Sequence, residues 1–194
     1  MESMQKLIQQ HIKDSIETKL RMEKEQGPVI ARISQSLIKV LGAGGTIYLC
    51  GNGGSAADAQ HVAAEFVGRF LRERRPLPAV ALTTNTSILT AIGNDYDYSQ
   101  VFSRQVRAQV TQRDAVVGIS TSGKSANVLQ ALRAAREIGA VTIGFTGSPG
   151  QPLASETDLC LCVPTKHTPF IQEAHIVAWH IICDLVEQAS IDAA

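Results

Sequence analysis

Apolar positions in the first forty residues recur every three or four places, which is the period of an amphipathic helix. They form two runs, Ile8, Ile12, Ile16 and Leu20, then Val29, Ile30, Ile33, Leu37 and Val40. Gly27-Pro28 separates the runs, and Pro28 suits the first turn of a second helix. We therefore expect two helices. The first has one apolar stripe and little of its own to pack on, so we expect it to dock on another chain.

After residue 45 the pattern changes, and short apolar runs alternate with helical ones. The apolar runs cover 46–50, 79–82, 115–119, 141–145 and 159–163, and the helical patterns cover about 55–71, 86–108, 124–138 and 171–188. Nearly continuous apolar strands separated by helices are typical of a parallel sheet covered on both faces. We predict an α/β fold, an open, doubly wound, flavodoxin-like sheet of five parallel strands flanked by helices. The expected division is an N-terminal helical arm for oligomerisation at 1–42 and one α/β domain at 43–194.

Composition and charge are those of an ordinary globular protein. Hydrophobic residues make up 44% and charged residues 19% of the 194 positions, and 18 Lys plus Arg balance 18 Asp plus Glu. A net charge of zero gives no global attraction to nucleic acid, and we interpret Arg72, Arg74 and Arg75 as a solvated turn rather than a basic patch. No run approaches the roughly 20 apolar residues of a membrane span, and the N-terminus lacks an apolar signal core. We therefore expect a cytoplasmic protein with neither a nucleic-acid nor a membrane partner.

The four cysteines agree with a reducing compartment. Cys50 ends an apolar run, Cys160 and Cys162 alternate within another, and Cys183 lies in a helical pattern. Since no C-x-x-C pair occurs, we expect buried, reduced thiols rather than a disulfide or a thiolate zinc site.

Two glycine-containing loops follow predicted strands and resemble nucleotide-binding patterns only superficially. Residues 51–56 (GNGGSA) match G-x-G-x-x-[GA], but the second strand ends in Leu82-Thr83-Thr84-Asn85, without the carboxylate that would hold a ribose. Residues 118–125 (GISTSGKS) match G-x-x-x-x-G-K-[ST], but no other strand ends in the acid that would organise Mg²⁺. We interpret neither loop as a nucleotide site.

Both loops nevertheless share the features of an anion site. Each offers glycine N–H groups, small hydroxyls and a helix N-terminus. The second loop carries four hydroxyls within six residues, which suits a sugar phosphate; they belong to Ser120, Thr121, Ser122 and Ser125. Ordinary helix capping by these side chains is the alternative interpretation.

Polar groups on two otherwise apolar helical patterns are candidates for chemistry. His61, Glu65 and Arg69 follow at four-residue intervals, so a helix places them on one face. A His–Glu pair at this spacing can share a metal or act as a base, and a solvated ion pair is the alternative. His180 lies among apolar neighbours, as either a functional or a core histidine. Gln172 begins the same helix, where it and the next residue could simply complement the helix dipole.

Four runs of the sequence, in the same order, resemble the phosphoheptose isomerases of the sugar isomerase (SIS) domain family. They are CGNGGSAADAQHVAAEFVGRF, LTAIGNDYDYSQVFSRQV, GISTSGKSANV and IQEAHIVAWH. The resemblance covers nearly the whole chain, including the arm. It implies a five-stranded parallel SIS domain, a homotetramer with sites at subunit interfaces, and an aldose–ketose isomerase. The implied reaction converts sedoheptulose 7-phosphate to D-glycero-D-manno-heptose 7-phosphate, the first step toward ADP- or GDP-heptose for cell-envelope glycans such as lipopolysaccharide.

The same resemblance implies a set of site residues. It assigns one Zn²⁺ per subunit to His61, Glu65, Gln172 and His180, with Glu65 as base and His180 as acid. The implied substrate contacts are Asn52, Gly53, Gly54, Ser55, Glu65, Arg69, Asn94, Asp95, Ser120, Thr121, Ser122, Ser125 and Gln172. The position before Ile171 is often basic in relatives, and here it is Phe170.

Two alternatives follow from this assignment. A non-catalytic SIS-domain regulator that binds a replication initiator protein resembles the chain as well, but it lacks the acid and the histidine that match Glu65 and His180. Gln172 and His180 are eight residues apart. On one regular helix they would be separated by about 12 Å along the axis and about 80° around it. An irregular first turn at Gln172 would ease this difficulty, and so would different subunits supplying the two ligands. Since the apolar stripe of the first helix also favours association, we expect one chain to complete another's site.

Overall fold

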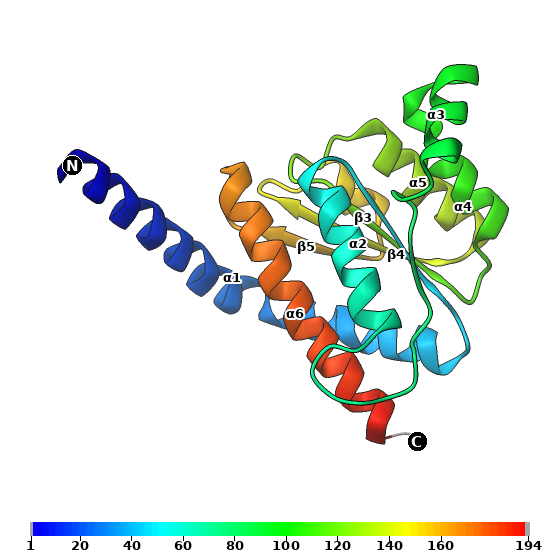
Figure 1. The fold of residues 1–194 in the computed structure, drawn as a ribbon, viewed down its shortest axis with the longest axis horizontal. Coiled ribbons are helices and arrows are strands. Elements are labelled where there is room, and N and C mark those ends of the chain that lie inside the picture. The colour runs from blue at the N-terminus through cyan, green and yellow to red at the C-terminus, as the bar shows by residue number, and fades with distance from the viewer. Residues whose placement is uncertain (1, 193–194) are drawn as a thin grey trace.

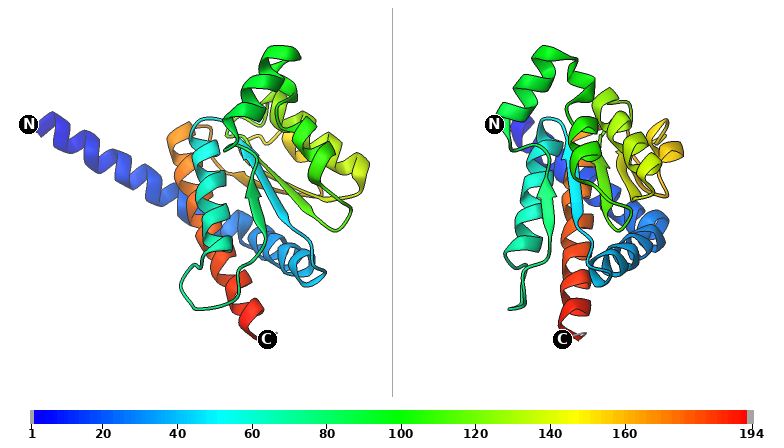
Figure 2. Two further views of the ribbon diagram at one scale, coloured as in Figure 1. Left: turned by 45° about the vertical axis from the view of Figure 1, so that its right-hand side comes forward. Right: turned by 90° about the vertical axis from the view of Figure 1, so that its right-hand side faces the viewer.

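A five-stranded parallel sheet forms the centre of the computed structural model, which describes residues 2–192 (Figures 1 and 2). Its strands are β1 (Ile47–Gly51), β2 (Ala79–Ala81), β3 (Ala115–Ile119), β4 (Val141–Gly147) and β5 (Leu159–Val163). They pair in the order β2-β1-β3-β4-β5, all parallel. The predicted doubly wound α/β sheet is confirmed, and each strand lies within two residues of its predicted apolar run.

Helices cover both faces of the sheet because successive strand residues point to opposite sides. One face carries α1 (Glu2–Gly42), α2 (Gly54–Val67) and α6 (Thr168–Asp192), and the other carries α3 (Thr86–Asp95), α4 (Ser103–Gln109) and α5 (Ala126–Ile138). Short 3₁₀ turns lie at η1 (Tyr98–Gln100) and η2 (Leu153–Glu156). On the first face the Trp179 ring of α6 stacks on Phe145 of β4, with ring centroids 4.4 Å apart. The site helices α2 and α6 therefore share one apolar layer.

The N-terminal region is one helix, not the two predicted on either side of Gly27-Pro28. Proline removes one helical hydrogen bond and crowds the preceding turn, at about 3 kcal/mol. Here Pro28 is on the exposed side of α1, where solvent can reach the freed carbonyl. Met22 before it and Ile30 after it are both buried in the same core. Because packing on both sides of the proline requires the helix to continue, it overrides the local signal.

The N-terminal half of α1 extends away from the rest of the chain (Figure 1). Its predicted apolar stripe is exposed in one chain, by 47% at Ile8, 53% at Ile12 and at Ile16, and 61% at Leu20. A polar contact fixes the base of this arm. Ser15 donates a hydrogen bond to Glu173 on α6, and Lys19 Nζ lies 3.1 Å from the same carboxylate. Glu173 therefore holds the base of the arm against α6, which is more than the interaction with the helix dipole expected from the sequence.

Two predicted helices are shorter or more broken than expected. The helix predicted to reach residue 71 ends at Val67, because Gly68 leaves the helical conformation and Arg74 binds the last carbonyls. The helix predicted over 86–108 divides into α3, η1 and α4. Asp97 accepts a hydrogen bond from the Ser99 N–H, and such local bonds of Asn and Asp compete with a helix.

No helix within residues 2–192 combines the length and apolarity needed to cross a bilayer. The four cysteines are free, as expected. Cys50 and Cys183 are buried, but Cys160 and Cys162 are only partly covered, because β5 is an edge strand. The prediction of buried thiols is therefore wrong for that pair, whose sulfur atoms lie 3.7 Å apart.

Candidate active site

Helices α2 and α6 bring together three of the residues expected to bind metal. His61 Nε2 lies 3.1 Å from His180 Nε2 and 3.4 Å from Glu65 Oε1. The His61 side chain is 46% exposed and that of Glu65 is 22% exposed. The ring of Phe70 lies 5.5 Å from that of His180. His180 is therefore a half-exposed functional candidate and not a core histidine.

The spacing of these three side chains was compared with the geometry of a zinc site. Two ligand atoms of one tetrahedral zinc ion, each about 2.0–2.1 Å from the metal, lie roughly 3.3 Å apart. The two distances from His61 Nε2 agree with this value. Across residues 2–192, however, no group of three or more His, Cys, Asp or Glu side chains is arranged so that all could hold one ion. One chain thus brings two pairs of candidate ligand atoms to the spacing of a zinc site, His61 with His180 and His61 with Glu65, but it does not assemble a complete ligand set.

Gln172, expected as the fourth ligand, binds a different partner. Its Nε2 donates to Asp58, a buried carboxylate one turn before His61 on α2. Burial raises the pKa of Asp58 to about 6, against the opposing effects of the Gln172 hydrogen bond and the charge of His61. Gly54 makes room for this contact, since a Cβ there would lie 2.9 Å from Gln172 Oε1. Within one chain, the Gln172 side chain is therefore bound to Asp58 and not to His61 or His180.

The hydroxyl-rich loop after β3 lies at the carboxyl edge of the sheet, where α5 begins. Ser120 Oγ and Ser125 Oγ are 2.9 Å apart, and Ser122 Oγ accepts from the Lys124 N–H at 3.3 Å. Ser125 is the N-cap of α5, but its side chain makes no capping hydrogen bond. The N–H groups of Ala126 and Asn127 are thus left available for an anion, whereas that of Val128 donates to Asn127 Oδ1 at 3.0 Å, which argues against ordinary capping by Ser125. Thr121 is half-buried beside this loop, and its carbonyl accepts from Gly147 N–H.

The glycine loop after β1 lies next to the hydroxyl loop. Asn52 exchanges two hydrogen bonds with buried Asn127 of α5, at 2.8 and 2.9 Å. Gly53 and Gly54 are exposed at the start of α2, Gly53 with a positive φ of 55°, and Ser55 is buried in the first turn. A cleft of about 470 Å³ opens beside both loops, lined by Asn52, Asp97, Tyr98, Ser99, Ser125, Ala126 and Asn127.

Three expected substrate contacts are exposed and, within residues 2–192, hydrogen-bond to neither loop. Asn94 and Asp95 are exposed at the end of α3, where Asn94 Nδ2 donates to Asp95 Oδ1 at 2.8 Å. In both Figure 1 and Figure 2, α3 projects from the rest of the chain. Arg69 is exposed and lies past the end of α2, so it does not continue the row of His61 and Glu65. The one-face prediction for Arg69 is wrong, because the helix stops two residues earlier.

Sequence patterns missed several residues that shape the site. Asp58 could have been noticed as an acid three places before His61, and Asn127 as an amide in the first turn after the hydroxyl loop. Arg74, interpreted as part of a solvated turn, has a side chain that is 3% exposed, so that interpretation is wrong. The core histidine of α6 is His175, which is fully buried with its Nε2 3.3 Å from the Thr146 carbonyl.

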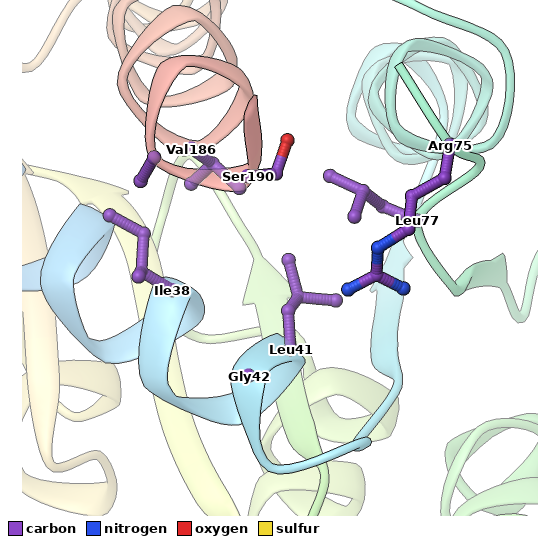
Figure 3. A pocket seen from close by; sticks show the side chains of 8 residues that line it. Ile38, Leu41, Gly42, Arg75, Leu77, Val186 and Ser190 are labelled. Carbon is purple, nitrogen blue, oxygen red and sulfur yellow. The ribbon is translucent and has the colours of Figure 1, made fainter. Parts of the chain in front are cut away.

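A second cavity, of about 120 Å³, lies at the opposite edge of the sheet (Figure 3). It is formed by the last turn of α1, the segment before β2 and the end of α6, with Leu41, Leu77 and Val186 among its walls and Arg75 at one side. None of the predicted site residues lines it. The cavity is separate from the candidate active site.

Comparisons with known proteins agree with this architecture. The SIS domain profile matches residues 10–147. The phosphoheptose isomerase of Roseiflexus sp. is 56% identical over 177 residues, covering 91% of this chain and 90% of that protein. That of Aneurinibacillus thermoaerophilus is 50% identical over 184 residues, covering 94% and 93%.

Solved structures extend the similarity to the fold. The phosphoheptose isomerase of Neisseria gonorrhoeae has a TM-score of 0.90 at 44% identity, covering 95% of this chain and 99% of that one. The Francisella tularensis phosphoheptose isomerase has a TM-score of 0.92 at 36% identity, covering 97% and 100%. The similarity thus includes α1 as well as the sheet.

Proposed function

This chain belongs to the SIS domain family, among its phosphoheptose isomerases, and we propose that it converts sedoheptulose 7-phosphate to D-glycero-D-manno-heptose 7-phosphate. The observation that carries the proposal is the convergence of Glu65 and His180 on His61, beside a sheet edge with an uncapped, hydroxyl-rich loop. The relatives described above are all named phosphoheptose isomerases, and no observation favours a regulator that binds a replication initiator.

The chemistry moves a proton between C1 and C2 of the sugar through an enediol. It requires a base for the carbon-bound proton and an acid for the oxygens. We assign the base to the half-buried carboxylate of Glu65 and the acid to the imidazole of His180. Their common contact with His61 supports this pairing, because it holds both side chains at one point between α2 and α6.

Substrate phosphate is assigned to the loop of residues 120–125. Two observations support this: the serine hydroxyls gather at the start of α5, and the N-cap residue Ser125 makes no side-chain capping hydrogen bond. A helix N-terminus favours an anion through its free N–H groups and its dipole. The assigned sugar contacts extend along the cleft from Asn52 toward α2.

One zinc ion per subunit is part of the proposal, with His61, Glu65, Gln172 and His180 as its ligands. When bound there, zinc would polarise the carbonyl and hydroxyl oxygens of the sugar. The spacing of His61, Glu65 and His180 supports such a group. Gln172 would have to leave Asp58, or come from a neighbouring subunit, to complete the set.

Assembly into a homotetramer and a cytoplasmic location belong to the same proposal. The exposed stripe of Ile8, Ile12, Ile16 and Leu20 supports assembly, because a second copy of the chain could cover it. Asn94 and Asp95, which bond to each other and not to the loops in the described part of one chain, are then assigned to a site completed across subunits. Mass determination in solution tests the tetramer, and cell fractionation tests the location.

The direct experiment incubates zinc-loaded protein with sedoheptulose 7-phosphate and separates the heptose phosphates by chromatography. We expect the aldose to accumulate until equilibrium is reached. Folded, zinc-loaded protein without turnover, combined with tight binding to a replication initiator, would instead establish the regulator.

A further inference from the structure

Arg74 binds the end of the helix that carries His61 and Glu65. Its guanidinium donates to the backbone carbonyls of Glu65 at 2.7 Å, Phe66 at 2.9 Å and Gly68 at 3.3 Å. A fourth bond goes to the carbonyl of Arg75 at 3.0 Å. The last carbonyls of a helix have no partner within the helix. Arg74 supplies one, and the shortest of its bonds is to Glu65 itself.

Glu187 holds the loop that contains Arg74. The side chain is fully buried on α6, and its two oxygens accept the N–H groups of Phe70, Leu71 and Arg72, each at 2.8 Å. Arg74 Nε lies 3.3 Å from Glu187 Oε1. Burial acts to raise the pKa of this carboxyl, but the three N–H groups and Arg74 together hold it below its usual range. Glu187 is therefore a buried, ionised group with every oxygen occupied.

The two residues connect the two helices of the candidate active site. Glu187 is seven residues after His180, close to two full turns, so both lie on the same face of α6. The loop from α2 to β2 passes along the C-terminal half of α6 (Figure 1). Phe70, whose N–H is bound by Glu187, places its ring 5.5 Å from that of His180.

We propose that the buried Arg74–Glu187 pair is a positioning device that sets the spacing of His61 and Glu65 against His180. The inference rests on the proposed function and names two residues through which that function acts. A buried ion pair is a poor way to gain stability alone, since desolvation can exceed the attraction. Here the pair instead ties the last turn of α2 and the loop after it to the Glu187 side chain of α6, and a displacement of either helix would separate the nitrogen atoms of His61 and His180, now 3.1 Å apart.

The test compares Glu187→Gln with Asp114→Asn. Asp114 is also a buried carboxylate, which accepts the N–H groups of Thr46 at 2.8 Å and Thr111 at 2.6 Å, but it precedes β3 and its side chain binds neither α2 nor α6. We expect both variants to melt at lower temperature. Only Glu187→Gln should lower kcat, by at least about tenfold, and weaken zinc binding in a chelator competition by about tenfold, as losses of groups behind metal ligands do. Inhibition by inorganic phosphate should stay unchanged in both.

Unchanged kcat and zinc affinity in folded Glu187→Gln would overturn the proposal and leave the pair a structural loop clamp. If that variant does not fold, Arg74→Lys replaces it, because lysine keeps the charge but cannot bridge four carbonyls. Zinc-loaded wild-type protein without turnover would refute the proposed function alone, since chelator competition still compares the variants. Wild-type protein that turns over the ketose without binding zinc would remove zinc from the proposed function, and kcat alone would then test the Arg74–Glu187 pair.

Discussion

His61 and His180, 119 positions apart in the chain, hold their Nε2 atoms 3.1 Å apart. At this distance one nitrogen donates and the other accepts, or both face a common cation. Two protonated rings would repel each other here. The contact therefore fits a hydrogen-bonded pair or a metal-bound pair, and it joins α2 to α6 where the chemistry is assigned.

Replacing Glu65 by glutamine keeps the shape of the side chain but removes the base. We expect turnover of sedoheptulose 7-phosphate to fall at least about 10²-fold, the usual share of general acid–base catalysis, while the substrate still binds. Steady-state kinetics and calorimetric binding measure the two effects. Glu137→Gln is the matched control, since Glu137 is an exposed carboxylate on α5 paired with Arg107 at 2.7 Å. Near-normal turnover in Glu65→Gln would demote Glu65 to a packing role.

The hydroxyl loop is tested by Ser122→Ala and Ser125→Ala. Each removes a hydroxyl assigned to the phosphate, so we expect KM to rise and inhibition by inorganic phosphate to weaken in parallel, by about tenfold each. The loss corresponds to one hydrogen bond to a charged group. Metal content should stay the same. Ser155→Ala, an exposed serine in η2, is the control. An unchanged KM in both variants would remove the phosphate from this loop.

His175 predicts how stability depends on pH. Burial lowers its pKa from 6.5 to about 4, against the hydrogen bond with the Thr146 carbonyl. Since the unfolded chain takes up the proton first, stability is complete above pH 6.5 and is lost as the pH falls toward 4, by roughly 3 kcal/mol. Denaturant unfolding between pH 6.5 and 4.5 should show a steep loss in the wild type and a flatter one in His175→Gln. The exposed His167 provides the control His167→Gln, and equal slopes in all three would contradict this prediction.

The shared site is tested by mixing inactive variants under conditions that allow subunits to exchange. His61 and His180 meet within one chain, so His61→Ala mixed with His180→Ala should stay inactive. Gln172 lies instead at Asp58, and we expect a neighbour to supply it. His61→Ala mixed with Gln172→Ala should then recover roughly a quarter of wild-type activity, because random assembly places the two intact parts together that often. Confirmed hetero-oligomers without activity would mean that each chain builds its own site.

Much of the fold is predictable because its signals are local. The five strands are apolar runs, of which the central β1, β3 and β4 are buried on both faces, and the two loops carry glycines and hydroxyl side chains at the ends of strands. His61 and Glu65 are one turn apart, so their proximity follows from helix geometry. The places where helices continue or end were less predictable. Core packing keeps α1 continuous through Pro28, and a side-chain hydrogen bond of Asp97 helps to interrupt the helix predicted over 86–108.

Other features depend on distant residues and leave no periodic signal. Arg74 appears in the sequence as one of several charges in a turn, yet its partners are the carbonyls of α2 and a glutamate 113 positions later. The pairing of Gln172 with Asp58 likewise depends on how α6 packs along α2. Such contacts follow from tertiary packing. The family resemblance identified Gln172 as a candidate zinc ligand, but it could not show that Gln172 binds Asp58 within one chain.

The central claim is that Glu65 and His180 isomerise a heptulose phosphate by proton transfer, and nuclear magnetic resonance in D₂O tests it most directly. Zinc-loaded protein is incubated with sedoheptulose 7-phosphate, and the C2 position of the aldose is observed as it forms. We predict that D-glycero-D-manno-heptose 7-phosphate appears with deuterium at C2, because the base exchanges its proton with solvent before the enediol collapses. Folded, zinc-loaded protein that leaves the ketose unchanged would contradict the account.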